Sequence, residues 1–248
     1  MYITSQNIKK ISQDKLHEIE TKIGFSLPAS YKGFLKTFGE GTYNGAVYIC
    51  FPNDTLLKEN EFARYDFWQH EEAPITQTQI EECVCLAQSV DGDMLIIHKS
   101  VNGLVLLPRH SDQITLFPID LYDFRLTIDN VIKQLFTDNE IDACYFENSP
   151  KSKFMYSRLD NVHDFIRLFK SRFVCDFLIE NKYNCNIFLL SMGGFVRFSL
   201  NNYSEAAIFY DDEGLSVFED VVKFLQDNGF EVCDGNNGGD HFFKQPMP

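Results

Sequence analysis

The sequence lacks the spacings that identify the common catalytic and nucleotide-binding motifs. It contains no GxSxG, HExxH, P-loop or GxGxxG segment. Gly92 and Gly103 fall in turns between expected strands, and neither begins a helix that could hold a phosphate. These absences exclude several enzyme classes, and we expect a protein that is not an enzyme and needs no cofactor.

Patterns of metal-binding residues are also missing. The six histidines show no pair at positions i and i+4, which is the spacing of a helical zinc site. Two acidic turns, at residues 91–93 and 211–213, lack the alternating ligands and the closing glutamate of a calcium loop. The sequence therefore predicts no metal site, and these residues are interpreted as solvated turns and structural histidines.

The seven cysteines are scattered, and no two of them form a CxxC pair. The N-terminal residues lack the apolar core of a secretory signal, and no apolar run reaches the ~20 residues that span a bilayer. We therefore expect reduced thiols in a cytoplasmic protein that makes no membrane contact. A thiol enzyme stays open as an alternative, since a cysteine and a histidine need only meet in space.

Basic residues are scarce relative to acidic ones. There are 22 lysines and arginines against 36 aspartates and glutamates, which gives a net charge of −14. Such a surface repels phosphate backbones and argues against a nucleic-acid partner. It attracts basic proteins and speeds their encounter, although acidity can also serve solubility alone.

What the sequence does contain is ample material for packed cores. Hydrophobic residues make up 44% of it and aromatic residues 15%. Apolar positions at helical spacing predict a first helix with Ser12 as N-cap and Gly24 as its end. Leu27-Pro28 then opens a second helix, and Gly39 and Gly41 end it. Its apolar face carries Tyr31, Phe34, Leu35 and Phe38. A short strand is expected at Val47–Phe51.

The segment Asn53–Gln79 is acidic and weakly periodic, so it is either a decorated loop or a helix with a mixed surface. It holds six acids against two basic residues and includes the only tryptophan. Exposed aromatic residues ringed by charge are typical of a partner-binding patch. The candidate partner-binding residues are Asp54, Glu59, Glu61, Tyr65, Asp66, Trp68, Glu71 and Glu72. The alternative is that Phe67 and Trp68 pack in the core while the acids face water.

An antiparallel meander is expected next, followed by a helix from Phe124 to Leu135 that covers the sheet. Asn102-Gly103 is a strong hairpin signal within the meander. The expected strands are Glu82–Ala87, Met94–His98, Leu104–Pro108 and Ile114–Phe117.

A second, smaller α+β domain is expected after a polar break near Asn148-Ser149-Pro150. The predicted division is residues 1–140, residues 145–235 and a flexible tail at 236–248. Helices are expected around 162–169 and 217–225. The predicted strands are Phe154–Tyr156, Phe173–Ile179, Asn186–Met192, Gly194–Leu200, Glu205–Tyr210 and Phe230–Cys233.

The order of elements in the first half resembles the SUKH superfamily over residues 8–136. The resemblance rests on a helix ending at Gly24, a Leu-Pro-x-x-Tyr-Lys-x-Phe-Leu segment over residues 27–35, and a glycine-containing stop at 39–41. Leu86-Ala87 and Gly92-Asp93 lie at matching places downstream. The fold class that we expect is α+β, with an antiparallel sheet packed by N- and C-terminal helices.

The resemblance implies a binding module without catalytic activity. Bacterial members of the superfamily are mostly immunity proteins that neutralise toxins, often nucleases, and fungal relatives act as regulatory scaffolds. The expectation is therefore an immunity protein whose partner is a basic toxin, and the alternative is a scaffold with no toxin partner.

Overall fold

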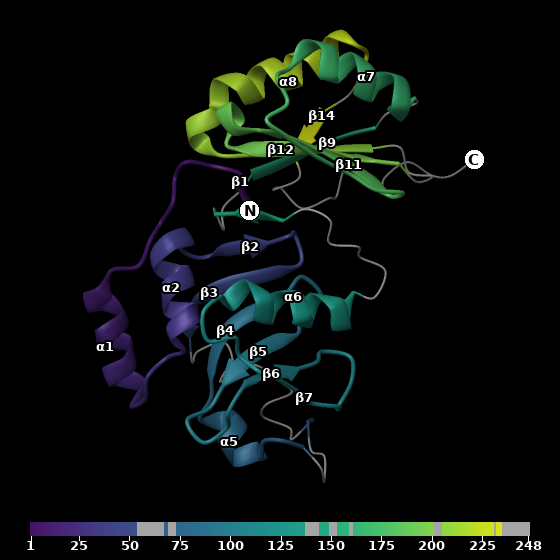
Figure 1. Ribbon diagram of the computed structural model, residues 1–248. Coiled ribbons are helices and arrows are strands. Elements are labelled where there is room, and N and C mark those ends of the chain that lie inside the picture. The colour runs from purple at the N-terminus through teal and green to yellow at the C-terminus, as the bar shows by residue number, and fades with distance from the viewer. Residues whose placement is uncertain are drawn as a thin grey trace. The chain divides into compact units, whose positions relative to one another are not determined.

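The chain folds into two compact units, which are described separately. The first unit is Ile8–Asn148, and the second combines Met1–Asn7 with Ser149–Pro248. This division falls after Asn148, and residues 1–7 group with the second unit, whereas the sequence analysis placed them in the first domain. The structure is a computed structural model (Figure 1) that describes residues 1–53, 67–68, 73–136, 144–148, 153–158, 161–200, 205–230 and 232–234. The expected tail at 236–248 lies outside these residues.

The two expected N-terminal helices are present in the first unit. Helix α1 (Gln13–Ile23) begins where the Ser12 hydroxyl accepts the backbone N–H of Lys15 at 3.1 Å, and Gly24 ends it with φ of 78°. A left-handed φ costs glycine little because it has no Cβ. Helix α2 (Ala29–Phe38) follows Pro28, whose backbone carbonyl accepts the first intrahelical bond.

The sheet of the first unit is antiparallel, as expected. Within residues 8–148 its strands lie in the order β8-β2-β3-β4-β5-β6-β7. The expected meander forms strands β4 to β7, and helix α6 (Phe124–Leu135) follows it. The strand bounds are β2 (Gly41–Tyr43), β3 (Val47–Asn53), β4 (Val84–Ser89), β5 (Met94–Ile97), β6 (Leu104–Leu107), β7 (Thr115–Phe117) and β8 (Tyr145–Glu147).

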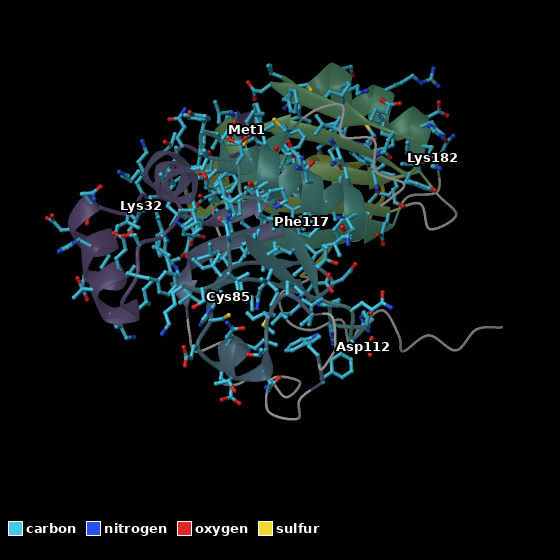
Figure 2. All side chains as sticks on the ribbon, turned by 60° about the horizontal axis from the view of Figure 1, so that its bottom comes forward. Met1, Lys32, Cys85, Asp112, Phe117 and Lys182 are labelled. Carbon is cyan, nitrogen blue, oxygen red and sulfur yellow. The ribbon has the colours of Figure 1, made fainter. Side chains whose placement is uncertain are left out.

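Both faces of this sheet are packed. Helices α2 and α6 meet over one face, where the rings of Tyr31 and Phe34 contact Phe124 at centroid distances of 5.1 and 6.3 Å (Figure 1). On the other face, alternate strand residues such as Cys85 and Ile96 pack with helix α5 (Gln77–Glu81). Figure 2 shows Cys85 beside that helix. Because both faces bury apolar side chains, the inner strands are almost wholly hydrophobic.

The second unit is a six-stranded antiparallel sheet with two helices on one face (Figure 1). Its strand order is β10-β11-β12-β13-β9-β14. The helices are α7 (Val162–Arg172) and α8 (Leu215–Asp227), whose apolar faces bury Phe165, Phe169, Val221 and Leu225 against the sheet. The strands are β9 (Lys153–Arg158), β10 (Phe177–Glu180), β11 (Asn184–Leu189), β12 (Gly194–Ser199), β13 (Glu205–Tyr210) and β14 (Val232–Asp234), and β1 (Tyr2–Ile3) is the short N-terminal strand.

The predicted α+β class is therefore confirmed for both units, and several predicted bounds are wrong. The strand expected at Phe173–Ile179 begins only at Phe177, because α7 continues to Arg172. Strands β2 and β8 were not expected. Gly41, interpreted as a helix stop, lies within β2, where an added Cβ would stand 2.1 Å from the Glu147 carbonyl oxygen. Helix α5 begins within the predicted acidic segment Asn53–Gln79, and the sequence did not predict it as a separate helix.

No helix in the described part of the chain is both long and apolar enough to cross a lipid bilayer. The same part of the chain holds no cluster of three or more histidine, cysteine, aspartate or glutamate side chains arranged to bind a metal ion.

Candidate interaction surface

Most of the predicted partner-binding residues lie outside the part of the chain that the structure describes. These are Asp54, Glu59, Glu61, Tyr65, Asp66, Glu71 and Glu72. Trp68 is described, and its side chain is only 2% exposed. Its indole Nε1 donates a hydrogen bond to the Pro108 carbonyl at 2.8 Å. Trp68 therefore packs in the core, which is the alternative that the sequence analysis left open, and it is not available to a partner.

The Leu-Pro-x-x-Tyr segment is a structural feature. The Tyr31 side chain is fully buried, and its hydroxyl donates a hydrogen bond to the backbone carbonyl of Cys50 in β3. Burial raises the pKa of Tyr31 well above its usual value, so the phenol stays neutral. The tyrosine thus joins α2 to the sheet. It has no accessible polar group with which to bind a ligand.

The geometry around His98 argues against thiol catalysis there. The ring is 5% exposed; its Nδ1 accepts the backbone N–H of Ser100 at 3.1 Å, and its Nε2 lies 3.3 Å from a carboxylate oxygen of Glu82. Since Nδ1 is an acceptor, Nε2 carries the proton and donates to Glu82. Both ring nitrogens are therefore engaged, and neither is placed to activate a cysteine.

Three cysteines of the first unit, Cys50, Cys83 and Cys85, are buried thiols, and Cys144 is half-buried. Burial raises the pKa of Cys83 to about 12, and its Sγ donates to the Gln79 carbonyl at 3.1 Å. Cys50 likewise has a raised pKa, because it donates to Cys85 and lies in an apolar environment. In the second unit, burial also raises the pKa of the exposed Cys175. For Cys50, Cys83 and Cys175, the raised pKa lowers the thiolate fraction, which is the opposite of what a nucleophile requires. The hydrogen bond with Cys50 lowers the pKa of Cys85, but that thiol is fully buried among apolar side chains and is not accessible to a substrate.

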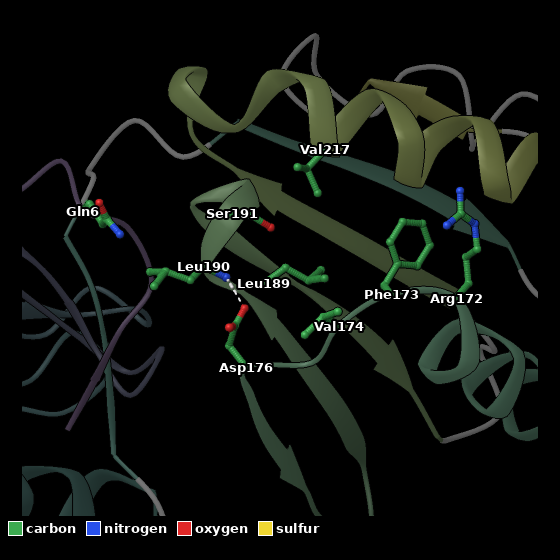
Figure 3. Close-up of a pocket in the computed structure, with 9 residues that line it drawn as sticks. All are labelled: Gln6, Arg172, Phe173, Val174, Asp176, Leu189, Leu190, Ser191 and Val217. Carbon is green, nitrogen blue, oxygen red and sulfur yellow. Dashed lines mark hydrogen bonds between the residues drawn. The ribbon is translucent and has the colours of Figure 1, made fainter.

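A shallow groove of about 510 Å³ opens on the second unit (Figure 3). The Asp176 carboxylate accepts the backbone N–H of Leu190 at 2.8 Å, so it braces the loop that forms one wall. The Arg172 guanidinium lies 5.6 Å from the centre of the Phe173 ring. The lining is Gln6, Arg172, Phe173, Val174, Asp176, Leu189, Leu190, Ser191 and Val217. None of these is a histidine or cysteine, and the groove offers an apolar surface without a catalytic set.

Comparison with known families finds a match within the first unit. Residues 10–124 match the model of the SMI1 / KNR4 family, SUKH-1. We refer to the unit Ile8–Asn148, which contains this match, as the SUKH-1 domain. The match covers a little under half of the chain and confirms the resemblance drawn from the Leu-Pro-x-x-Tyr order. No curated protein and no solved structure gave a significant match to the chain.

The SUKH-1 match ends at the first residue of α6, and the second unit lies entirely outside it. Immediately before that end, Leu121 and Tyr122 are 75% and 92% exposed. They are the two most exposed large apolar side chains among the described residues of the SUKH-1 domain. Leu126, in the first turn of α6, is 51% exposed. Sequence periodicity did not single out these residues, because they lie in a short connection between a strand and a helix.

Proposed function

We propose that this protein is an immunity protein, which neutralises a toxin by binding it directly through the SUKH-1 domain. The observation that carries the proposal is the SUKH-1 match over residues 10–124, since the bacterial members of the superfamily are mostly immunity proteins. The net charge of −14 supports a basic toxin, because an acidic inhibitor is steered onto a basic protein. The buried thiols of Cys50, Cys83 and Cys85, together with the fully engaged His98, support action by binding and not by catalysis.

The direct test is co-expression with the toxin that a neighbouring gene encodes. The toxin alone should arrest growth, and co-expression with this chain should restore it. With purified proteins, inhibition should reach completion at an equimolar ratio, since an inhibitor that occludes a site acts stoichiometrically. Growth that stays arrested despite normal expression of both chains would overturn the proposal.

The acidic segment provides a sharper test of where the toxin binds. We propose that Asp54, Glu59, Glu61, Asp66, Glu71 and Glu72 steer the basic partner, with Tyr65 among them. Reversing these charges should slow association and weaken its dependence on salt, while dissociation changes less. A control reverses Glu219 and Asp220, two exposed acids on α8 of the second unit. Slowing that is equal per reversed charge in both sets would show a general charge effect and no particular face.

A regulatory scaffold without a toxin partner is the alternative function. The observation that favours it is the second unit, which has its own core and groove and lies outside the SUKH-1 match. Genes for signalling or cell-wall proteins beside this one would favour the scaffold, and a toxin gene would favour immunity. Deleting the second unit should leave toxin neutralisation intact if the SUKH-1 domain alone carries that function.

A further inference from the structure

The connection between β7 and α6 presents two large apolar side chains to solvent. Leu121 is 75% exposed and Tyr122 is 92% exposed, and they are adjacent in the chain. Single exposed hydrophobic residues are common on protein surfaces. An aliphatic and an aromatic residue that follow each other in the chain and are both this exposed cannot be explained by packing in the core. Tyrosine is also one of the residues most enriched among binding hot spots.

Hydrogen bonds hold this connection in one shape. The Asp120 carboxylate oxygen Oδ1 accepts the backbone N–H groups of Tyr122 at 2.8 Å and of Asp123 at 2.7 Å. The backbone of Asp120 is fixed in turn, because its N–H donates to the Thr127 hydroxyl at 2.9 Å and its carbonyl accepts from Ser30 at 2.6 Å. Two bonds therefore fix the shape of the turn, and two more tie it to α6 and α2. A rigid turn presents its side chains to a partner at a small entropic cost.

From this arrangement we infer that Leu121 and Tyr122 are the apolar anchor of the SUKH-1 domain, and that they insert into a hydrophobic pocket on a basic partner protein. The inference rests on the proposed function, and it names the contact that holds the toxin once charge has brought the two proteins together. Leu126, in the first turn of α6, is a third exposed apolar residue close to the anchor in sequence.

Charge around the anchor favours a basic occupant. Residues 111–135 contain four aspartates against Arg125 and Lys133, so this stretch of sequence carries a net charge of −2, and the whole chain carries −14. The cation nearest to the anchor in sequence, Arg125, is held by both carboxylate oxygens of Asp123, at 2.8 and 3.0 Å from Nε. Its charge is therefore compensated and does not repel a basic surface. The exposed face of the Tyr122 ring can also take a lysine or arginine of the partner in a cation–π contact.

The first experiment measures binding kinetics with the toxin encoded by the neighbouring gene. The double variant Leu121→Ser/Tyr122→Ser should weaken the affinity roughly thirtyfold or more, which is the size of a hot spot, and mostly through faster dissociation. The control is Val90→Ser, because Val90 is 60% exposed in a turn of the same unit. Val90→Ser should leave the affinity within about twofold. Equal affinity of the double variant and wild type would overturn the inference and leave the proposed function standing.

A second pair of variants tests the rigidity of the turn. Asp120→Ala keeps both apolar side chains but removes the acceptor that orients them, and the affinity should fall by roughly three- to tenfold. Asp120→Asn retains a carbonyl oxygen in the same place and should restore most of the binding. If the alanine variant binds as tightly as wild type, the turn is not preorganised for the partner. Circular dichroism should show all four variants folded, since the changed anchor side chains are exposed.

A third experiment tests whether Leu121 and Tyr122 form a binding surface without requiring that the toxin be known. A phage-displayed library of random peptides is selected on the immobilised wild-type chain and counter-selected on Leu121→Ser/Tyr122→Ser. Enriched peptides should combine apolar residues with lysine or arginine. Peptides that bind both chains equally, or that are acidic, would overturn the inference. Concentration-dependent dimerisation that the double variant abolishes would also overturn it, because the occupant would then be a second copy of this chain.

Failure of the two proposals can thus be told apart. If the wild-type chain neither binds nor inhibits the neighbouring toxin, the proposed function is lost, and the peptide selection alone decides whether Leu121 and Tyr122 form a binding surface for basic apolar segments. If the wild-type chain inhibits the toxin and the double variant inhibits it equally well, only the anchor is wrong.

Discussion

Glu20 and Lys32 join the first two helices of the SUKH-1 domain. The Lys32 ammonium donates to Glu20 Oε1 at 2.7 Å, and the same oxygen accepts the backbone N–H of Leu27 at 2.8 Å. The two side chains are only 14% and 23% exposed. One carboxylate therefore fixes the end of α1, the corner before Pro28 and the first turns of α2. Lys32 is the lysine of the Leu-Pro-x-x-Tyr-Lys segment, and its role is structural because it pairs with Glu20.

This pair should make stability depend on pH. The hydrogen bond from Lys32 lowers the pKa of Glu20 below its usual value. A lowered folded-state pKa contributes stability above the unfolded pKa, and that stability is lost as the pH falls through the folded pKa. The free energy of unfolding should therefore decline between about pH 5 and pH 3. Glu20→Gln should lower it by roughly 1 kcal/mol at pH 7 and flatten this decline.

Urea denaturation at a series of pH values measures this effect. The control is Glu18→Gln, because the Lys15–Glu18 pair is 55% and 69% exposed and lies on one helix. Its effect should be smaller than that of Glu20→Gln at every pH. If Glu20→Gln and wild type lost stability in parallel on acidification, Glu20 would not be the group responsible.

Tyr31→Phe should weaken the link between α2 and the sheet. The substitution removes the hydroxyl that donates to the Cys50 carbonyl and leaves that buried acceptor without its partner. We expect a loss of roughly 1–2 kcal/mol in the free energy of unfolding, with little change in the fold. The matched control is Tyr122→Phe, whose hydroxyl is on the surface and whose removal should leave stability unchanged. Equal stability of both variants would mean that the Tyr31 hydrogen bond is unimportant.

Sequence periodicity predicted helices α1, α2, α6, α7 and α8 and most strands of both units, because each buries one regular apolar face. It missed strand β2, although the sequence contains a signal for it. Asn44 and Gly45 both have positive φ, of 52° and 63°, and Ala46 donates to the Tyr43 carbonyl. These are the features of a type I′ turn, which joins two paired strands. The nearby Gly39 and Gly41 were interpreted as a helix stop, and that interpretation hid the hairpin.

Asn102-Gly103, the pair that predicted the hairpin, lies in a longer connection between β5 and β6. Strands β5 and β6 do pair as expected, but the tight turn closes between the His98 carbonyl and the Val101 N–H.

The position of Trp68 could not be decided from sequence either, because an aromatic residue among acids can lie in a surface patch or pack in the core. Leu121 and Tyr122 were missed for a related reason: exposure of a turn depends on how its backbone is held, which here depends on contacts with Ser30 and Thr127.

The N-terminal residues should stabilise the second unit. The Tyr2 ring stacks on Phe177 at a centroid distance of 5.0 Å and contacts the edge of Phe188 at 5.3 Å. The Ser5 hydroxyl donates to Asp211 at 2.9 Å in a buried environment. Deleting residues 1–7 removes an aromatic cluster and a buried hydrogen bond, so the second unit should lose roughly 1–3 kcal/mol. Hydrogen exchange should become faster in β10 and β11.

Point variants separate the ring from its hydroxyl. Tyr2→Ala should reproduce most of the effect of the deletion. Tyr2→Phe should be neutral or slightly stabilising, because the buried Tyr2 hydroxyl has no hydrogen-bond partner among the described residues. If exchange in β10 and β11 were unchanged by Tyr2→Ala, the N-terminal segment would not be part of the folded second unit in solution.

Trp68 gives the most direct optical test of the SUKH-1 unit, because it is the only tryptophan of the chain. Its indole is 2% exposed and packs with Ile80, Cys85 and neighbouring apolar residues. The native protein should therefore show blue-shifted tryptophan emission that acrylamide quenches poorly, and urea should shift the emission to the red. Trp68→Phe should cost roughly 1–3 kcal/mol, since it removes the hydrogen bond to Pro108 and leaves a gap in the core. Emission that is already red-shifted and readily quenched in the native state would place Trp68 on the surface, and would restore it to the acidic partner-binding patch.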